Sequence, residues 1–222
     1  MSTELLPSIE IETAPNPDAS VIWLHGLGAD GNDFVPIVPE LGLAPAPAVR
    51  FVFPHAPVRP VTINNGMRMR AWYDISAADL QNRADLAGVR QSQALVEALI
   101  ERERSRGVAS ARIVLAGFSQ GGAIALYTGL RHAQRLGGVI ALSTYLVAAD
   151  KLASEASAAN RGLPIFMGHG TADPIVRYQW GEASRRTLEA AGYPVEWHGY
   201  PMPHSVCMEE IVALGAWLRR AW

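Results

Sequence analysis

Short apolar runs rich in β-branched residues recur along the chain and predict buried strands. They occupy residues 21–24, 49–53, 112–116, 138–142, 164–167 and 195–197. A continuous apolar run of this length is typical of a strand whose two faces are both covered. The pattern therefore favours a sheet that lies inside the molecule.

Segments with helical spacing lie between these runs. The clearest is 83–106, which Gly107 follows as a stop signal and in which one face carries Leu86, Val89, Val96, Leu99 and Ile100. Residues 121–131, 178–191 and 205–222 are further predicted helices. Because alternating strands and helices are typical of βαβ units, we predict an α/β fold with a mostly parallel central sheet and helices on both faces.

The composition fits one globular domain spanning residues 1–222. Hydrophobic residues make up 49% of the chain and charged residues 18%, so the chain can bury a large core and is not disordered. The 19 basic and 21 acidic residues give a net charge of −2, without any run of five like charges. This balance excludes the basic surface of a nucleic-acid binder and favours a small-molecule partner.

Cysteine content and the N-terminal segment favour a cytoplasmic protein. The single cysteine, Cys207, excludes an internal disulfide framework and fits a reducing compartment. Glu4 and Glu10 lie where a secretory signal needs a basic start and an apolar run. Residues 113–130 are uncharged and just long enough to span a membrane, but the polar and glycine residues at their centre favour a buried strand, turn and helix. No stable membrane insertion is predicted.

A G-x-S-x-G motif at residues 117–121 lies between a predicted strand and a predicted helix. Such an elbow holds its serine in strained φ/ψ space, so the residues two before and two after it must be small, as Gly117 and Gly121 are. The start of the following helix directs backbone N–H groups at an oxyanion beside Ser119. Ser119 is therefore the candidate nucleophile. A glycine-rich turn in which it only caps a helix is the alternative.

A serine nucleophile needs a histidine to accept its proton, and His204 is the candidate. It lies between the last predicted strand and the last predicted helix, where catalytic residues of parallel sheets gather. His132 ends a predicted helix beside arginines and His198 ends a strand, so neither is favoured. His25 and His169 each precede a glycine, and we expect both to make backbone hydrogen bonds that shape loops.

Two carboxylates compete to orient this histidine. Asp150 precedes Lys151, a pattern that indicates the solvated start of a helix. Asp173 follows the strand at 164–167 through a short turn, which Pro174 stiffens. With Asp173, the chain order is nucleophile, acid, base, as in hydrolases that carry this elbow. Asp173 is the candidate acid, and a plain turn residue is the alternative.

A glycine-rich loop at residues 26–31 leaves an early strand where such a hydrolase donates its second oxyanion N–H. We assign the two donors to the backbone N–H groups of Leu27 and Gln120, since the loss of one costs about 2.7–4 kcal/mol of transition-state stabilisation. The glycines also match G-x-G-x-x-G, but Asp30 and Asp33 put negative charge where a pyrophosphate would bind. A dinucleotide site is therefore not predicted.

Residues 54–80 lack clear periodicity and are too long for an ordinary connection. They predict a functional loop or irregular structure. Met67, Met69 and Trp72 supply either a homodimer contact or a wall of the substrate site, and composition does not choose between the two.

Five motifs occur in order: LHGLGADGNDF (24–34), PHAPVRPVTINNGMRMRAWYDI (54–75), GFSQGGAIALYTGL (117–130), GHGTADPIV (168–176) and PMPHSV (201–206). Through them almost the whole chain resembles the carboxylesterase and acyl-protein thioesterase family of serine hydrolases, in its bacterial type. The resemblance implies an α/β-hydrolase fold. It also maps the family's nucleophile, acid, base and two oxyanion donors onto Ser119, Asp173, His204, Leu27 and Gln120.

The resemblance further implies that Ile63, Ile75 and Tyr145 line the acyl channel. Around Asn65 the chain departs from members that act on long acyl chains, and a polar side chain there would interrupt an apolar channel. The mechanism implies no metal and no organic cofactor.

We predict a serine carboxylesterase that hydrolyses carboxylic esters through an acyl-serine intermediate. Residues 143–163 are too short for a separate cap domain, so we expect a shallow, open pocket that favours short to medium acyl chains. The alternative is an acyl-protein thioesterase (depalmitoylase) or a lysophospholipase. A third hypothesis is a catalytically inert binding module on a hydrolase scaffold, which would have no need of an intact Ser, Asp and His set.

Overall fold

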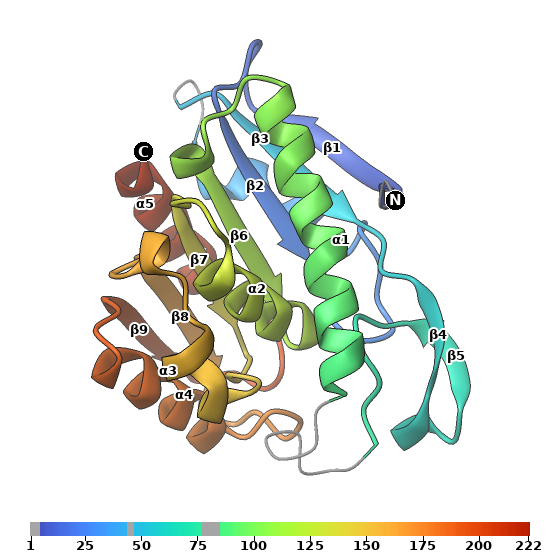
Figure 1. Ribbon diagram of the computed structural model, residues 1–222. Coiled ribbons are helices and arrows are strands. Elements are labelled where there is room, and N and C mark those ends of the chain that lie inside the picture. The colour runs from blue at the N-terminus through green and yellow to red at the C-terminus, as the bar shows by residue number, and fades with distance from the viewer. Residues whose placement is uncertain (1–4, 44–46, 77–84) are drawn as a thin grey trace.

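The computed structural model describes residues 5–43, 47–76 and 85–222. Its centre is a seven-stranded sheet in the order β1-β3-β2-β6-β7-β8-β9 (Figure 1). Neighbouring strands are parallel except β1 and β3, which are antiparallel. The strands of this sheet are β1 (Ser8–Glu12), β2 (Ala19–Leu24), β3 (Val49–Pro54), β6 (Ile113–Phe118), β7 (Gly138–Leu142), β8 (Ile165–Gly170) and β9 (Val195–Tyr200).

All six predicted strands are present. Strands β3, β6, β8 and β9 continue past their predicted ends, β6 as far as Phe118 and β8 as far as Gly170. The extensions of β6, β8 and β9 contain glycine, and those of β8 and β9 also contain histidine, which an apolar run does not include. They carry the backbone directly to the carboxyl edge of the sheet, where the candidate site residues lie.

Alternating residues of each strand pack on opposite faces of the sheet. In β2, Ile22 and Leu24 belong to one buried cluster, and Val21 and Trp23 to the other. Because both faces are covered, every residue of β2 is buried, as expected for a strand inside a parallel sheet.

Helices form the two outer layers. The apolar faces of α1 (Leu86–Ser105), α2 (Gln120–Arg131) and α4 (Tyr178–Ala190) contribute to the first cluster, and α5 (Met208–Ala221) contributes to the second. Figure 1 shows α1 and α2 crossing one face of the sheet. Residues 83 and 84 of the first predicted helix lie outside the described residues. The last helix begins at Met208 and not at residue 205, because Cys207 has extended backbone as its N-cap.

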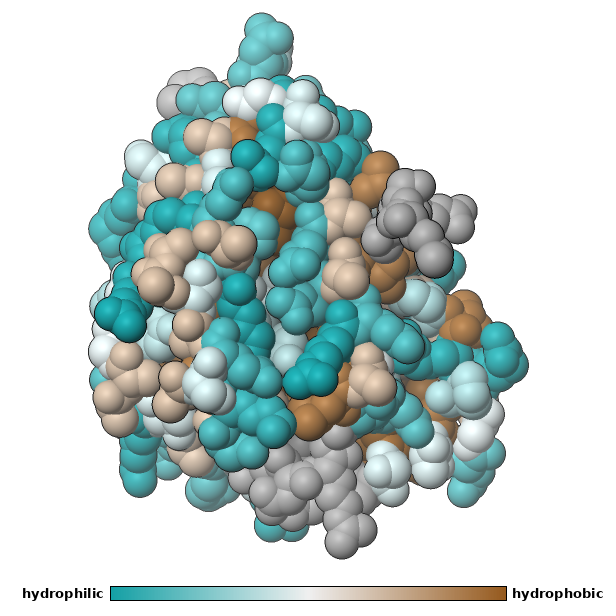
Figure 2. All heavy atoms as spheres, in the orientation of Figure 1, coloured by the Kyte–Doolittle hydropathy of each residue, from teal (hydrophilic) through white to brown (hydrophobic). Residues whose placement is uncertain are grey.

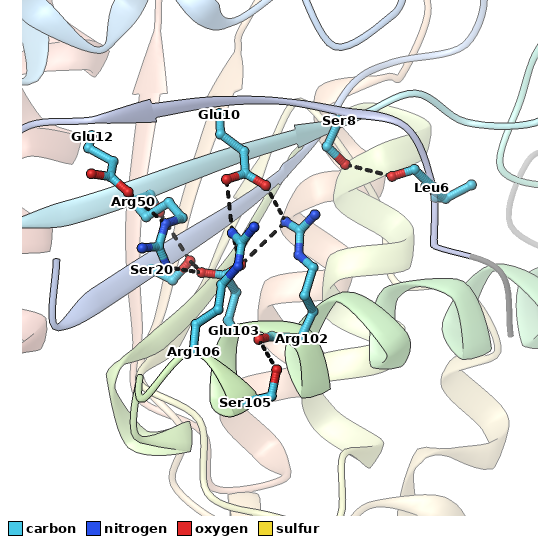
Figure 3. Close-up of polar contacts among 10 residues, drawn as sticks. All are labelled: Leu6, Ser8, Glu10, Glu12, Ser20, Arg50, Arg102, Glu103, Ser105 and Arg106. Atoms are coloured by element: carbon cyan, nitrogen blue, oxygen red, sulfur yellow. Dashed lines mark hydrogen bonds and ion pairs between the residues drawn. The ribbon is translucent and has the colours of Figure 1, made fainter. Parts of the chain in front are cut away.

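The edge strand β1 was not predicted, since its sequence SIEIE has no apolar run. Ile9 and Ile11 pack on the second cluster, whereas the glutamates join an ion cluster beneath α1 (Figure 3). At its centre lies Glu103, fully buried, with ion pairs to Arg50, Arg102 and Arg106 at 2.9, 3.3 and 3.1 Å. Two of these arginines also pair with Glu10 of β1. The cluster therefore attaches the edge strand to α1.

The segment predicted to be irregular contains a two-stranded hairpin of β4 (Val58–Val61) and β5 (Met67–Arg70). Residues 77–80 of that segment lie outside the described residues. Figure 2 shows a largely hydrophilic face with some apolar side chains over this hairpin, where Val58 and Met67 are exposed. Trp72, by contrast, is fully buried. It forms no surface for a homodimer contact.

Residues between β7 and β8 form no separate layer. They hold only α3 (Leu152–Glu155) and two short 3-10 turns, in agreement with the expectation of no cap domain. Within the described residues, no helix combines the length and the apolar character needed to cross a membrane. The uncharged segment 113–130 divides, as predicted, into β6, a turn and α2.

Candidate active site

Ser119 lies in the turn between β6 and α2 with φ 53° and ψ −120°. This left-handed backbone is costly for a residue with a side chain, so close packing must hold it in place. A Cβ on Gly117 would overlap the backbone of Gly121, and one on Gly121 would overlap the carbonyl oxygens of Leu24 and His25. The turn can form only with glycine on both sides of the serine, as the motif predicts.

His204 and Asp173 form a hydrogen-bonded pair at the carboxyl edge of the sheet. The His204 Nδ1 and Asp173 Oδ2 atoms are 2.6 Å apart. The Asp173 Oδ1 atom accepts hydrogen bonds from the backbone N–H groups of Ile175 and Val176, at 2.8 and 2.9 Å. Burial raises the pKa of the Asp173 carboxyl, but these hydrogen bonds outweigh it, so the pKa lies below its ordinary value and the carboxylate is ionised.

Ser119 and His204 line the same cavity. The His204 ring packs against Phe118, with ring centroids 4.6 Å apart. Its Nδ1 atom is engaged by Asp173, which leaves Nε2 as the free nitrogen. Among the hydrogen bonds of the described residues, none joins the Ser119 hydroxyl to this ring.

The cavity has a volume of about 930 Å³, near the upper end of the roughly 300–1,000 Å³ typical of small-molecule pockets. Its walls include Ile63, Ile75 and Tyr145, the three residues that the family resemblance implied. Four further residues that line the cavity were not predicted from the sequence: Ile175, Val176, Arg177 and Trp180. Their position just after Asp173 could have indicated this role, because the loops at the carboxyl edge of a parallel sheet surround its binding sites.

One polar residue of the cavity wall differs from expectation. Asn64 lines the cavity, whereas Asn65, where a polar interruption was expected, occupies an exposed left-handed turn.

The hydroxyl of Tyr145 is 2.5 Å from that of Tyr73, and both tyrosines are buried. Burial raises the pKa of Tyr145 to about 12, so the pair is neutral at ordinary pH.

The backbone N–H groups of Leu27 and Gln120 are the predicted oxyanion donors. Both residues line the cavity, and no backbone or side-chain hydrogen bond of the described residues uses either N–H. Gln120 is the first residue of α2, so its N–H has no intrahelical partner. The side chain of Gln120 does not enter the site, because it is hydrogen-bonded to the backbone of Trp72 and Tyr73.

No other histidine hydrogen-bonds to Asp173 or His204 among the described residues, although His169 Nε2 lies 3.6 Å from Asp173 Oδ2. His25 Nδ1 bonds the Gly26 carbonyl at 2.7 Å, and His169 Nε2 bonds the Val176 carbonyl at 2.8 Å, which confirms the loop-shaping roles expected of both. His198 pairs with Glu196. Asp150, the competing carboxylate, is exposed. Among the described residues, no cluster of His, Cys, Asp or Glu side chains could hold a metal ion.

Residues 7–221 match the model of the phospholipase/carboxylesterase family. The chain belongs to this family. It therefore has an α/β-hydrolase fold and is a serine hydrolase, as the resemblance implied.

Proteins of the family similar to this chain include fungal and plant members. Acyl-protein thioesterase 1 of Neurospora crassa is 41% identical over 217 residues, covering 94% of this chain and 89% of that protein. The same-named protein of Yarrowia lipolytica is 39% identical, with 96% of each chain covered. The crystal structure of Arabidopsis thaliana SOBER1 has a TM-score of 0.86 at 31% identity and covers 91% of this chain and 98% of its own. These relatives are eukaryotic and do not support the bacterial type that was expected.

Proposed function

We propose that the chain hydrolyses thioesters of acylated proteins, with Ser119 as nucleophile, His204 as general base and Asp173 as the acid that orients it. The observation that carries this proposal is the hydrogen bond of 2.6 Å between His204 and Asp173 at the cavity that Ser119 lines. In the proposed reaction, His204 would activate the Ser119 hydroxyl beside a space of substrate size.

The reaction would proceed in two halves. The Oγ atom of Ser119 attacks the thioester carbonyl while His204 removes the hydroxyl proton. The N–H groups of Leu27 and Gln120 bind the resulting oxyanion. Collapse of the tetrahedral intermediate breaks the C–S bond, and His204 gives its proton to the departing thiolate. Water then attacks the acyl-serine with His204 as base again, which releases the carboxylic acid and restores the serine hydroxyl.

Similarity to named thioesterases favours thioesters over the general carboxylic esters of our first prediction. The Neurospora crassa and Yarrowia lipolytica relatives, 41% and 39% identical, are both named acyl-protein thioesterase 1. The cavity volume of about 930 Å³ with Ile63, Ile75 and Tyr145 on its wall also favours an apolar acyl chain as ligand. A general carboxylesterase activity on short to medium chains and a lysophospholipase activity remain the competing hypotheses.

A substrate panel tests the proposal. The wild type and Ser119→Ala would be assayed on an S-palmitoylated peptide, the matching O-palmitoyl peptide, p-nitrophenyl esters from acetate to palmitate and a lysophospholipid. We expect the S-palmitoylated peptide to give the highest kcat/KM, and Ser119→Ala to be inactive and unlabelled by a fluorophosphonate. A higher kcat/KM on acetate or butyrate esters would favour the carboxylesterase hypothesis. A labelled but thioester-inactive wild type would overturn the proposal.

Two structural expectations remain predictions. We propose that residues 1–222 form a single domain, since the helices on both faces share one sheet. The homodimer is a prediction that sedimentation analysis of the purified chain would test.

A further inference from the structure

Trp72 links three separate segments through its polar groups. It follows β5 and its side chain is fully buried. Its backbone N–H donates to Gln120 Oε1 at 2.8 Å, and its indole N–H donates to the His25 carbonyl at 2.9 Å. Its own carbonyl accepts a hydrogen bond from the Ser92 hydroxyl of α1. No polar group of Trp72 is spare, and the reaction proposed above uses none of them.

The first of these bonds fixes the start of α2. Besides accepting from Trp72, the Gln120 side chain donates through Nε2 to the Tyr73 carbonyl at 2.8 Å. The amide is thus held by both a donor and an acceptor on adjacent residues, and its side chain is buried. Because Gln120 is the first helical residue, this attachment also fixes the direction of its backbone N–H.

The second bond fixes the loop that holds Leu27. The His25 ring accepts from the Ala56 N–H at 3.0 Å through Nε2, so its proton is on Nδ1, which donates to the Gly26 carbonyl. The His25 and Trp72 rings also pack together, with centroids 5.4 Å apart. The backbone is therefore held at residues 25 and 26, immediately before the N–H of Leu27.

The two N–H groups need such a link because they lie beyond the ends of their strands. Strands β2 and β6 are paired from Ser20–Ile113 to Leu24–Gly117, and this register does not extend to residues 27 and 120. An oxyanion hole, however, requires its donors to be held within about 0.5 Å of the productive geometry. Some contact outside the sheet must supply that accuracy.

We infer that Trp72 is a positioning residue that sets the spacing between the Leu27 and Gln120 N–H groups. The effect of this positioning on catalysis rests on the proposed function. A misplaced donor weakens binding of the oxyanion more than binding of the ground-state carbonyl, so the loss of the link lowers kcat and leaves KM nearly unchanged.

Two variants break the link at different points. Trp72→Phe keeps a buried ring but loses the indole donor to His25, and Gln120→Met keeps the volume but loses both bonds to residues 72 and 73. Trp217→Phe is the matched control, because Trp217 is buried under the opposite face of the sheet, in the cluster that includes α5. Ser92→Ala, which removes the third bond with little change in volume, provides a further variant if a larger change prevents folding.

On the S-palmitoylated peptide we expect kcat to fall about 10- to 100-fold in Trp72→Phe and Gln120→Met, with KM within about twofold of wild type. Affinity for an alkyl trifluoromethyl ketone, whose adduct with serine carries an oxyanion, should fall by the same factor. Inhibition by palmitate, which makes no such adduct, should not change. A kcat equal to that of Trp217→Phe, or equal losses in ketone and palmitate affinity, would overturn the inference.

Amide hydrogen exchange gives a readout independent of activity. The Gly28 N–H, which donates to the Arg70 carbonyl at 2.9 Å, is the protected amide of this loop. Its exchange should rise at least tenfold in Trp72→Phe and remain at the wild-type level in Trp217→Phe. Unchanged exchange in Trp72→Phe would show that the bridge does not hold the loop. If the wild type neither hydrolyses substrate nor reacts at Ser119, the proposed function fails, while the exchange result still decides whether Trp72 holds the loop.

Discussion

Asp173 and His204 are separated by 31 residues of sequence, and their Oδ2 and Nδ1 atoms lie 2.6 Å apart. Parallel pairing of β8 with β9 brings them together, because Asp173 follows the carboxyl end of β8 and His204 follows that of β9. The carboxylate also accepts two backbone N–H bonds, so its orientation is set before substrate binds.

The Asp173→Asn variant should lose most activity while keeping its fold. An amide retains the shape of the carboxylate but favours the wrong tautomer of His204 and cannot stabilise its charged form. We expect kcat to fall about 10⁴-fold with little change in KM. Steady-state rates on the S-palmitoylated peptide provide the measurement. Asp150→Asn, at the exposed competing carboxylate, is the control and should match wild type.

The Gly121→Ala variant should lose both stability and activity. Its Cβ would overlap the carbonyl oxygens of Leu24 and His25, so the elbow must shift and move Ser119. Gly192→Ala serves as a reference, since Gly192 has φ 86° but no neighbouring atom within contact range. That variant should lose only about 1–2 kcal/mol from backbone strain and remain active. Equal activity in the two variants would contradict the close packing of the elbow.

Glu210 should make stability depend on pH. Its carboxyl is fully buried in α5, and no hydrogen bond of the described residues reaches either oxygen. Burial raises the pKa from its ordinary 4.5 to about 8. The folded state therefore binds the proton more tightly than the unfolded state, and stability that is present in acid declines as pH rises from 4.5 through 8.

Glu210→Gln cannot ionise and should remove this dependence. We expect the variant to be more stable than wild type at pH 8.5, by on the order of 2–4 kcal/mol, with the difference shrinking towards pH 5. Urea unfolding of the two proteins at several pH values measures the stability difference and its change with pH. A stability difference that does not vary with pH would show that Glu210 does not titrate in the folded protein.

The Tyr73 and Tyr145 hydroxyls should stabilise the fold as a pair. Replacing either tyrosine by phenylalanine leaves the other buried hydroxyl unpartnered, which we expect to cost about 1–3 kcal/mol. The double variant leaves neither hydroxyl and should cost less than the sum of the two single variants. Denaturant unfolding of the four proteins gives the coupling energy, and strictly additive losses would argue against the pair.

The ion cluster beneath α1 should contribute to stability without affecting catalysis. Glu103→Gln removes the central negative charge and leaves Arg50, Arg102 and Arg106 without their shared partner. We expect unfolding to become easier by about 3–5 kcal/mol, with kcat/KM unchanged because β2 and β3 meet the cluster at Ser20 and Arg50, near their amino ends. Glu101→Gln, which breaks an exposed pair with Arg104, should cost less than about 1 kcal/mol.

Local patterns in the chain were sufficient to predict six of the seven strands of the central sheet, the main helices and the residues around Ser119. A buried parallel strand needs an apolar run, and a strained elbow needs Gly117 and Gly121, so each feature depends on residues close together in the sequence. The order of Ser119, Asp173 and His204 along successive strand ends follows from the same alternation of strand and helix.

Contacts between distant segments decided the rest. The strand β1 has no apolar run, and it is held by pairing with β3 and by ion pairs from α1. Trp72 was ambiguous between a dimer contact and a substrate wall, and only its three hydrogen-bond partners place it inside the molecule. The burial of Glu210 and the pairing of Tyr73 with Tyr145 likewise depend on what packs against each side chain, which the pattern of neighbouring residues does not encode.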